Sequence, residues 1–495
     1  MKWKGLGIIS LVLFGLAACS EIDTMKNTEE STDIQESKEP IILKEDNKNE
    51  FMIVANERKH TFTKNSSIEA WTFNGSVPGS QIRLKQGEEV KIHLKNELPD
   101  PITIHWHGIT VNNNMDGIPG VTQNAVQPGD TYTYRFTPED PGTYMYHTHQ
   151  DGVNQMDKGL AGSLIVEPQE AEQLDRDYTL VLDEWNTNSD EKLGGMMEGM
   201  MEGMMGNMDA YDMYTINGKT GESIKPLEVK EGEKVRIRLV NVGFMSHAFH
   251  LHGHEYKIVA VDGQKINEPK AIENKLISVA PGERYDIEFT ADNSGDWYLE
   301  RHGNEEGTEN MKIQIKYKNA TVNEDRSNQQ VALPHFDYTS YGEASDSPFA
   351  LSQVYDVEYT MDLNTEMKNH EMAYTINGKT FPNTENIQVK EGEKVKVTLR
   401  NNSMMDDHPM HLHGHFFQII SKNGKLVEGS PIIKDTVNLT PGDEYVIAFE
   451  ADNPGDWLFH CHDLHHASAG MVNMVKYDNF QPDFELDPNA NNKPE

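Results

Sequence analysis

The sequence predicts an all-β protein built from three tandem β-sandwich domains. Three stretches can be superimposed on one another, and they begin with WTFNG at Trp71, YTING at Tyr214 and YTING at Tyr374. Each stretch has an aromatic residue that opens a strand, an Asn-Gly turn, and then an alternating strand such as KVKVTL. This period-2 alternation and frequent turn signals favour sandwiches. A repeat of about 150 residues is too long for a solenoid unit.

The repeats set the expected domain boundaries. Domain one is predicted at residues 50–168, domain two at 175–318 and domain three at 352–478. A methionine-rich insert at 194–213 interrupts domain two, and residues 319–351 are expected to link domains two and three. The polar tail, residues 479–495, is predicted to be disordered.

The N-terminus predicts export and lipid anchoring. Lys2 and Lys4 precede an apolar run of about fourteen residues, which is too short to span a membrane comfortably. LAAC at its end resembles the bacterial lipobox, so residues 1–19 are interpreted as a lipoprotein signal peptide and Cys19 as the lipidated residue. An ordinary cleaved signal with a chance cysteine is the alternative. Residues 20–49 would then be a flexible tether that holds the protein at the outer face of the cell membrane.

Charge and cysteine content restrict the partners and the bonding. The formal net charge of −36 excludes nucleic acid as an expected partner and favours cations, although a merely solvated acidic surface would look the same. If Cys19 carries lipid, Cys461 has no intrachain partner for a disulfide and needs another use. We expect a monomer.

Histidines form four clusters within domains one and three. On a β-strand, residues i and i+2 point to one face, so each H-x-H motif aims two imidazoles into one space. Four such pairs supply eight imidazoles, which exceed the needs of one ion and suit a cluster of about three borderline ions such as copper. The pairs are His105 and His107, His147 and His149, His411 and His413, and His460 and His462.

Cys461 belongs to a second site, because the middle residue of HCH faces away from that cluster. His466 follows the cysteine by five residues, Met471 follows it by ten, and His408 opens the other motif of the same domain. His₂Cys with a weak axial methionine is the blue-copper electron-transfer arrangement. His465 is adjacent to His466 and is the alternative ligand.

Domain two lacks this chemistry. Arg301 stands at its position equivalent to Cys461, and Thr148 stands there in domain one. Domain two keeps HAFHLHGH at residues 247–254, but it has no facing H-x-H pair. These histidines are interpreted as structural or vestigial in preference to an additional metal site.

Together, HWHG, YHTH, HPMHLHGH and HCHDLHHASAGM resemble the motifs of the bacterial three-domain multicopper oxidases, the laccase-like group built from cupredoxin-like Greek-key domains. The resemblance covers about residues 50–478. It implies four copper ions, and reduction of O₂ to water coupled to four one-electron oxidations. By resemblance, the type 1 ligands are His408, Cys461, His466 and Met471. The type 2 ligands are His105 and His411. The type 3 ligands are His107, His147, His149, His413, His460 and His462.

An acid near the cluster is also expected, because O₂ reduction consumes protons. Asp116 in NMDGIPG matches the acidic position of the family, although Asp-Gly is also a common turn. Some relatives carry a second acid directly after the last type 1 histidine, where this chain has Ala467.

Methionine clusters indicate the electron donor, since thioethers are soft ligands for Cu(I). In the insert, glycines weaken any helix, so we expect a mobile loop, with a self-packed insertion as the alternative. Met404, Met405, Asp406 and Asp407 immediately precede His408 and could dock a cuprous ion, with a solvated loop as the alternative. The candidate methionines of the insert are Met196, Met197, Met200, Met201, Met204, Met205 and Met208.

The leading hypothesis is a cuprous oxidase that supports copper tolerance. A laccase acting on phenols or aromatic amines would use the same machinery. A copper-sequestering protein without turnover would not need Cys461 between two cluster ligands. A copper nitrite reductase would share the type 1 site but would not need all eight cluster histidines.

Overall fold

The computed structural model describes residues 34–44, 49–187, 211–303, 307–318, 332–368 and 371–494. The predicted signal peptide with Cys19 and the seven candidate methionines of the insert lie outside these residues. No helix among the described residues is long and apolar enough to cross a membrane. The compact unit that contains all described residues begins at Ile34.

The first domain pairs a four-stranded sheet, ordered β3-β2-β5-β7, with a five-stranded sheet, ordered β1-β4-β9-β8-β6. Burial alternates along its strands, as in VKIHLKN of β5, where every second residue is buried. The strands are β1 (Ile42–Lys44), β2 (Glu50–Thr63), β3 (Ser66–Phe73), β4 (Gly79–Lys85), β5 (Val90–Asn96), β6 (His105–His107), β7 (Thr131–Phe136), β8 (Gly142–His147) and β9 (Ala161–Glu167).

The second domain has a six-stranded sheet, ordered β11-β10-β13-β18-β15-β16, and a five-stranded sheet, ordered β12-β20-β19-β14-β17. Its strands are β10 (Arg176–Trp185), β11 (Met213–Ile216), β12 (Leu227–Val229), β13 (Lys234–Asn241), β14 (His247–Leu251), β15 (Tyr256–Val261), β16 (Gln264–Lys265), β17 (Ile277–Val279), β18 (Arg284–Thr290), β19 (Asp296–His302) and β20 (Lys312–Tyr317).

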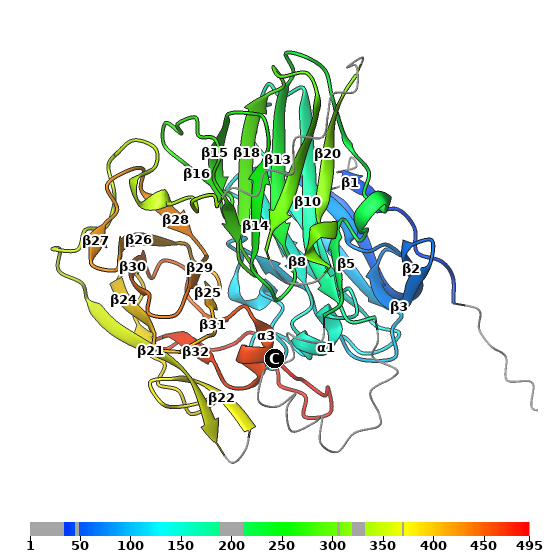
Figure 1. Cartoon of the computed structure of the whole chain (residues 1–495). Helices are drawn as coiled ribbons and strands as arrows, with labels where there is room; N and C mark the ends of the chain where they lie inside the picture. Colours follow the sequence, from blue (N-terminus) through cyan, green and yellow to red (C-terminus); the bar gives the residue numbers. More distant parts are fainter. Residues whose placement is uncertain are drawn as a thin grey trace, which may run out of the picture. The chain divides into compact units, whose positions relative to one another are not determined.

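The third domain repeats the second, with the sheets β22-β21-β24-β30-β26-β27, to which β28 is joined, and β23-β32-β31-β25-β29. Its strands are β21 (Val357–Lys368), β22 (Glu371–Ile376), β23 (Ile387–Val389), β24 (Lys394–Asn401), β25 (His408–Leu412), β26 (Phe417–Lys422), β27 (Lys425–Leu426), β28 (Ile432–Lys434), β29 (Thr436–Leu439), β30 (Glu444–Glu450), β31 (Asp456–Cys461) and β32 (Val472–Tyr477). Short helices α1 (Gly152–Met156) and α3 (Leu464–Ser468) follow β8 and β31 (Figure 1). The predicted all-β class is confirmed.

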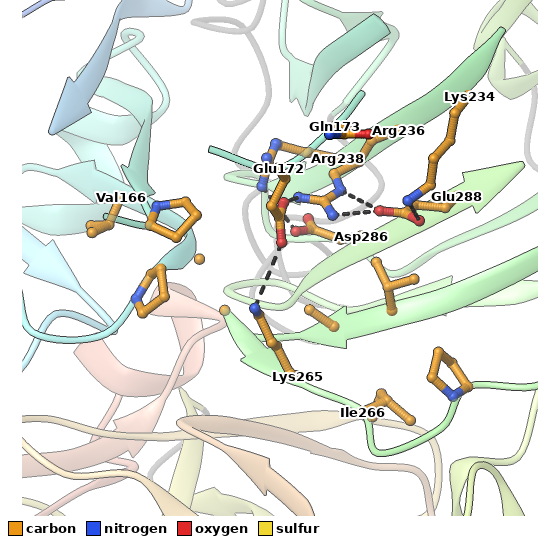
Figure 2. Close-up of a pocket in the computed structure, with 17 residues that line it drawn as sticks. Val166, Glu172, Gln173, Lys234, Arg236, Arg238, Lys265, Ile266, Asp286 and Glu288 are labelled. Carbon is orange, nitrogen blue, oxygen red and sulfur yellow. Dashed lines mark hydrogen bonds and ion pairs between the residues drawn. The ribbon is translucent and has the colours of Figure 1, made fainter. Parts of the chain in front are cut away.

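Charged residues line a cavity of about 390 Å³ between domains one and two (Figure 2). Arg236 forms ion pairs with Glu172 and Glu288, and Arg238 Nη1 lies 2.9 Å from Asp286 Oδ2. Because these basic groups are already paired with carboxylates, the cavity is not a ready binding site for an anion. It is lined by none of the residues expected to bind copper.

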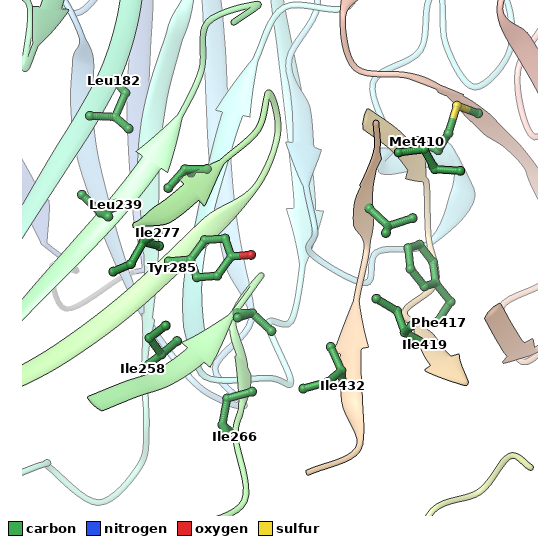
Figure 3. Packing of buried hydrophobic residues seen from close by; sticks show 14 of the residues in the cluster. Leu182, Leu239, Ile258, Ile266, Ile277, Tyr285, Met410, Phe417, Ile419 and Ile432 are labelled. Carbon is green, nitrogen blue, oxygen red and sulfur yellow. The ribbon is translucent and has the colours of Figure 1, made fainter. Parts of the chain in front are cut away.

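A continuous hydrophobic core joins domains two and three (Figure 3). Ile258 and Ile277 belong to the same cluster as Phe417 and Ile432, and all four are fully buried. Tyr341, from the segment between these domains, also packs here, and its hydroxyl accepts a hydrogen bond of 3.0 Å from the Ile258 amide. This packing holds the domain-three strands at a defined place against domain two.

The tail returns to domain one. The Asn124 side-chain amide donates to the Glu485 carbonyl at 2.7 Å, and the Asp151 amide donates to the Lys493 carbonyl at 2.9 Å. Ala490 is 3% exposed. The prediction of a disordered tail is wrong over residues 479–494, because polar side chains of domain one satisfy the backbone groups of the tail.

Candidate metal centres

Two pairs of strands bring the eight predicted cluster histidines together. In domain one, β6 pairs with β8 and places His105 opposite His147. In domain three, β25 pairs with β31 and places His411 opposite His460. The two halves meet face to face, since the rings of His107 and His411 stack with centroids 3.7 Å apart. The buried histidines of this cluster are His105, His107, His147, His149, His411, His413, His460 and His462.

Several ring nitrogens in this cluster have no hydrogen-bond partner within the described residues. They include Nε2 of His105, His147 and His411, and Nδ1 of His107. Buried polar atoms of this kind are costly unless something binds them. Burial lowers the pKa of His107 and His147 well below the ordinary value, so their rings are neutral and keep a lone pair. The donor set therefore fits copper, which accepts neutral imidazole nitrogen.

Asp116 orients two of the rings, as expected for an acid near the cluster. Its backbone carbonyl accepts a hydrogen bond of 2.9 Å from His105 Nδ1, and its Oδ2 lies 3.0 Å from His413 Nδ1. The opposite nitrogens are thereby directed at the cluster. The turn interpretation also holds: Gly117 has φ +83°, and a Cβ there would lie 1.8 Å from the Ile104 carbonyl oxygen.

Asp435 likewise orients two rings of the cluster, those of His107 and His411, and the sequence did not predict this role. Its Oδ1 lies 3.1 Å from His107 Nε2, and its backbone carbonyl accepts from His411 Nδ1 at 3.0 Å. Burial opposes ionisation, but the bidentate Arg284 guanidinium holds the pKa of Asp435 well below its usual range. The only sequence signal is an acid that directly follows the apolar strand PIIK, and no local pattern links it to His107.

The second predicted site lies within domain three. Cys461 Sγ is 3.5 Å from His466 Nδ1 and 4.0 Å from His408 Nδ1, and the two nitrogens are 3.3 Å apart. Ser403 Oγ, at 2.7 Å from His408 Nε2, orients that ring. Met471 is fully buried, and its carbonyl accepts from the Cys461 amide at 3.1 Å, which places its backbone beside the thiol.

Of the two adjacent histidines, His466 is the one beside Cys461. His465 turns away, with Nδ1 at 3.2 Å from Asp463 Oδ1 and its ring 4.9 Å from that of Phe244. The one-residue difference on α3 separates the two rings because consecutive helical residues do not share a face.

Domain two carries a guanidinium where domain three has its thiol. The register of β14 on β19 places Arg301 opposite Phe249, as Cys461 stands opposite Met410. Arg301 Nε donates to His247 Nδ1 at 3.0 Å. The Arg301 guanidinium therefore bonds His247, the histidine that corresponds to His408. Because domain two has this cation in place of a thiol, the thiolate site is formed in domain three.

Sequence comparison places the chain in a family. Three models described as multicopper oxidase match residues 55–171, 176–321 and 351–481. The chain belongs to the multicopper oxidase family. This oxidase is 29% identical to multicopper oxidase MmcO of Mycobacterium tuberculosis, over 83% of each chain. It is 31% identical to Laccase-2 of Botryotinia fuckeliana, over 81% of this chain and 78% of that one. It is 24% identical to Copper resistance protein A of Escherichia coli, over 83% of this chain and 90% of the relative.

Solved structures confirm the predicted cupredoxin-like architecture of the oxidase. The multi-copper oxidase of Pseudomonas thermotolerans is 26% identical, with a TM-score of 0.68, over 89% of this chain and all of that chain. Membership of the family implies copper as cofactor and O₂ as oxidant, with metal ions or aromatic compounds as reductants. Because the relatives include laccases, a copper resistance protein and iron transport oxidases, the family leaves the reductant undetermined.

Two methionines of the oxidase are exposed beside the mononuclear site. Met404 is 92% exposed and Met405 is 83% exposed, and both precede β25. Asp406 Oδ2 accepts from Thr365 Oγ1 at 2.6 Å, and Asp407 Oδ2 accepts from the Asn438 amide at 2.9 Å. Asp407 lines a groove of about 480 Å³ between domains two and three. The structure therefore keeps sulfur in solvent and a carboxylate within a groove, on one loop.

Proposed function

We propose that the oxidase converts Cu(I) to Cu(II) outside the cell, with O₂ as electron acceptor, and so supports copper tolerance. The exposure of Met404 and Met405 beside His408 carries the proposal. Apolar side chains gain stability from burial, yet these two are almost fully exposed where a donor must approach. Thioether sulfur is a preferred ligand for Cu(I).

Asp407 adds a second reason. Carboxylate oxygen is a harder ligand than sulfur and suits the divalent product better than the monovalent substrate. Burial raises the pKa of Asp407, and the Asn438 side-chain amide bonds to it and opposes that effect. A loop that offers both ligand types beside one histidine can bind the ion before and after it loses an electron. The relative named Copper resistance protein A agrees with this role.

We also propose four resident copper ions in the arrangement that the family resemblance implies. When bound, copper supplies one-electron transfer at the thiolate site and O₂ reduction at the histidine cluster. His408, Cys461, His466 and Met471 would hold the first ion, and the eight cluster imidazoles would hold three more. Cys461 is bonded through the backbone to His460 and His462, so the covalent path from the thiolate to the cluster is short.

The overall reaction takes four electrons from four Cu(I) ions and delivers them, with four protons, to one O₂ molecule to give two water molecules. Asp116 is the acid nearest to this proton demand in our assignment, since its carboxylate contacts both His105 and His413.

A laccase-type reaction with phenols or aromatic amines is the second candidate. The 31% identity to Laccase-2 favours it, and it would use the same thiolate site. A copper-sequestering protein without turnover is less well supported, because storage does not require a thiolate between two cluster ligands.

Oxygen uptake with Cu(I) and with a phenol separates the two reactions. The double variant Met404→Ser and Met405→Ser should raise KM for Cu(I) and leave phenol oxidation unchanged. Met52→Ser is the control, since Met52 is 52% exposed on β2 of domain one. Deletion of residues 194–208 tests the insert in the same assay. Equal loss with both donors, or no loss with either, would remove the methionines from the proposal.

The thiolate site has its own test. Cys461→Ser should abolish both the blue colour of the copper-loaded protein and O₂ uptake with either donor. A colourless variant with full activity would show that electrons do not pass through Cys461.

We propose that lipid on Cys19 holds the oxidase at the outer face of the cell membrane. Cys19→Ser should move the protein from the membrane fraction into the medium. Retention of the variant in the membrane would contradict a lipid anchor.

A further inference from the structure

Domain two contains a cluster of its own, here called the domain-two cluster, formed by His250, His252, Glu300 and His302. The register of β14 on β19 places His250 opposite Glu300. The ring centroid of His250 lies 4.1 Å from that of His252 and 5.5 Å from that of His302. One ring nitrogen from each histidine lies within 4.8 Å of the other two. Glu300 Oε1 lies 2.7 Å from His252 Nε2 and 3.7 Å from His302 Nε2.

The cluster repeats half of the catalytic one. HLHGH occurs in both domains, and the opposition of His250 to Glu300 repeats that of His411 to His460. The domain-two residues His250, His252, Glu300 and His302 thus take the places of His411, His413, His460 and His462. Among the described residues, the two H-x-H pairs of domain one face the catalytic cluster, and domain one supplies no second set against these residues. Three imidazoles and one carboxylate make a complete ligand set for a single ion.

Two side chains of the cluster carry buried nitrogens that the described residues leave without a normal hydrogen bond. His250 is 5% exposed, and neither of its ring nitrogens has a hydrogen bond of normal geometry; the Asn274 side chain lies close enough to act as a weak hydrogen-bonding partner. His302 Nε2 is also buried and has no hydrogen bond of normal geometry to the described residues. A purely structural histidine would ordinarily satisfy at least one nitrogen, as His254 does through the His252 carbonyl and the Tyr317 hydroxyl. A bound cation would satisfy both residues at once.

The orientation of Glu300 and the access to the cluster also suit a cation. Lys312 Nζ lies 3.4 Å from Glu300 Oε2, which leaves Oε1 directed at the histidines. His302 lines the groove of about 480 Å³ that Asp407 also lines. An ion can therefore approach His302 from the groove beside the proposed Cu(I) loop.

We propose that the domain-two cluster binds one divalent ion of borderline softness, Zn²⁺ or Cu²⁺, separately from the catalytic coppers. The ligands are His250, His252, His302 and Glu300. Imidazole nitrogen with one carboxylate oxygen is a ligand set that both ions accept. The proposal does not depend on the identity of the electron donor, because it concerns binding and no turnover.

The test uses the full-length, copper-loaded protein dialysed against a low concentration of Zn²⁺ and, in a second arm, of Cu²⁺. Bound metal per chain is then counted by elemental mass spectrometry. The protein should retain one ion more than the double variant His250→Ala and His302→Ala. Retention of that ion in either arm supports the site and identifies the metal. The blue colour should persist in the variant, since Cys461 lies in another domain.

Glu300→Gln tests the site without changing its volume, and it serves if the double variant does not fold. Outer partners of metal ligands are worth about 10–100-fold in affinity, so removal of a ligand charge should weaken binding at least about tenfold. His93→Asn is the control, because His93 is a half-buried histidine of β5 that bonds Thr133 Oγ1 at 2.8 Å. Equal retention by the protein and both cluster variants, or retention of no additional ion in either arm, would overturn the proposal.

Discussion

Asp116→Asn tests how the histidine cluster is held. The Asp116 side chain is 2% exposed, and its Oδ2 lies 3.0 Å from His413 Nδ1. Its Oδ1 lies 3.2 Å from His105 Nδ1, which bonds the Asp116 backbone carbonyl. Asparagine keeps the size and one acceptor oxygen, but its NH₂ group must face one imidazole N–H. The variant therefore loses the carboxylate charge that strengthens the His413 hydrogen bond and places its NH₂ group against an imidazole N–H, of either His413 or His105.

The expected effect follows from that single contact. A hydrogen bond to a charged group is worth about 1.5–3 kcal/mol. At about 1.4 kcal/mol for each factor of ten, this corresponds to about 10–100-fold, which matches the usual effect of removing an outer partner of a metal ligand. We expect cluster copper affinity and the rate of O₂ uptake to fall within that range.

The assay measures copper per chain, blue absorbance and O₂ uptake on the same preparation. Blue absorbance should stay unchanged, because it depends on Cys461, His408 and His466, which Asp116 does not orient. Asp130→Asn, the same chemical change on an exposed turn of domain one, should leave all three readings unchanged. Unchanged copper content and turnover in Asp116→Asn would refute the reasoning. Loss of blue absorbance would mean that the substitution damages the fold and not only the cluster.

Three further predictions concern stability and the tail. Arg284→Ala leaves Asp435 buried without its partner, so urea denaturation of the copper-free protein should show a loss of about 3–5 kcal/mol, and Arg284→Lys a smaller loss; an unchanged midpoint would contradict the ion pair. Burial raises the pKa of Asp157 to about 6 from an ordinary 3.8, so its stabilising contribution is complete below pH 3.8 and is lost as the pH rises through about 6. Asp157→Asn should therefore raise the free energy of unfolding more at pH 8 than at pH 4, by up to about 3 kcal/mol, and thermal unfolding at the two pH values measures this difference. Equal stabilisation at both pH values would contradict the raised pKa. Deletion of residues 484–495 removes the Pro494 carbonyl, which lies 2.7 Å from His149 Nδ1, and should lower cluster copper while blue absorbance persists; full copper content would show that the tail is dispensable.

The sequence by itself determined the local chemistry. Period-2 alternation predicts the strands, and the same period places both imidazoles of an H-x-H motif on one face and Cys461 on the other. Internal repetition was enough to show that Arg301 stands in domain two where Cys461 stands in domain three. These inferences succeed because strand geometry depends only on neighbouring residues.

The tertiary structure alone decided which residues support that chemistry. Asp435 orients His107 from 328 positions away in the chain, and the Pro494 carbonyl contacts His149 from 345 positions away. The bond from Arg301 to His247 and the separation of His465 from His466 likewise depend on strand register and packing. Such contacts leave no local pattern, because they arise only when domains one, two and three pack together and bring distant segments into hydrogen-bonding range.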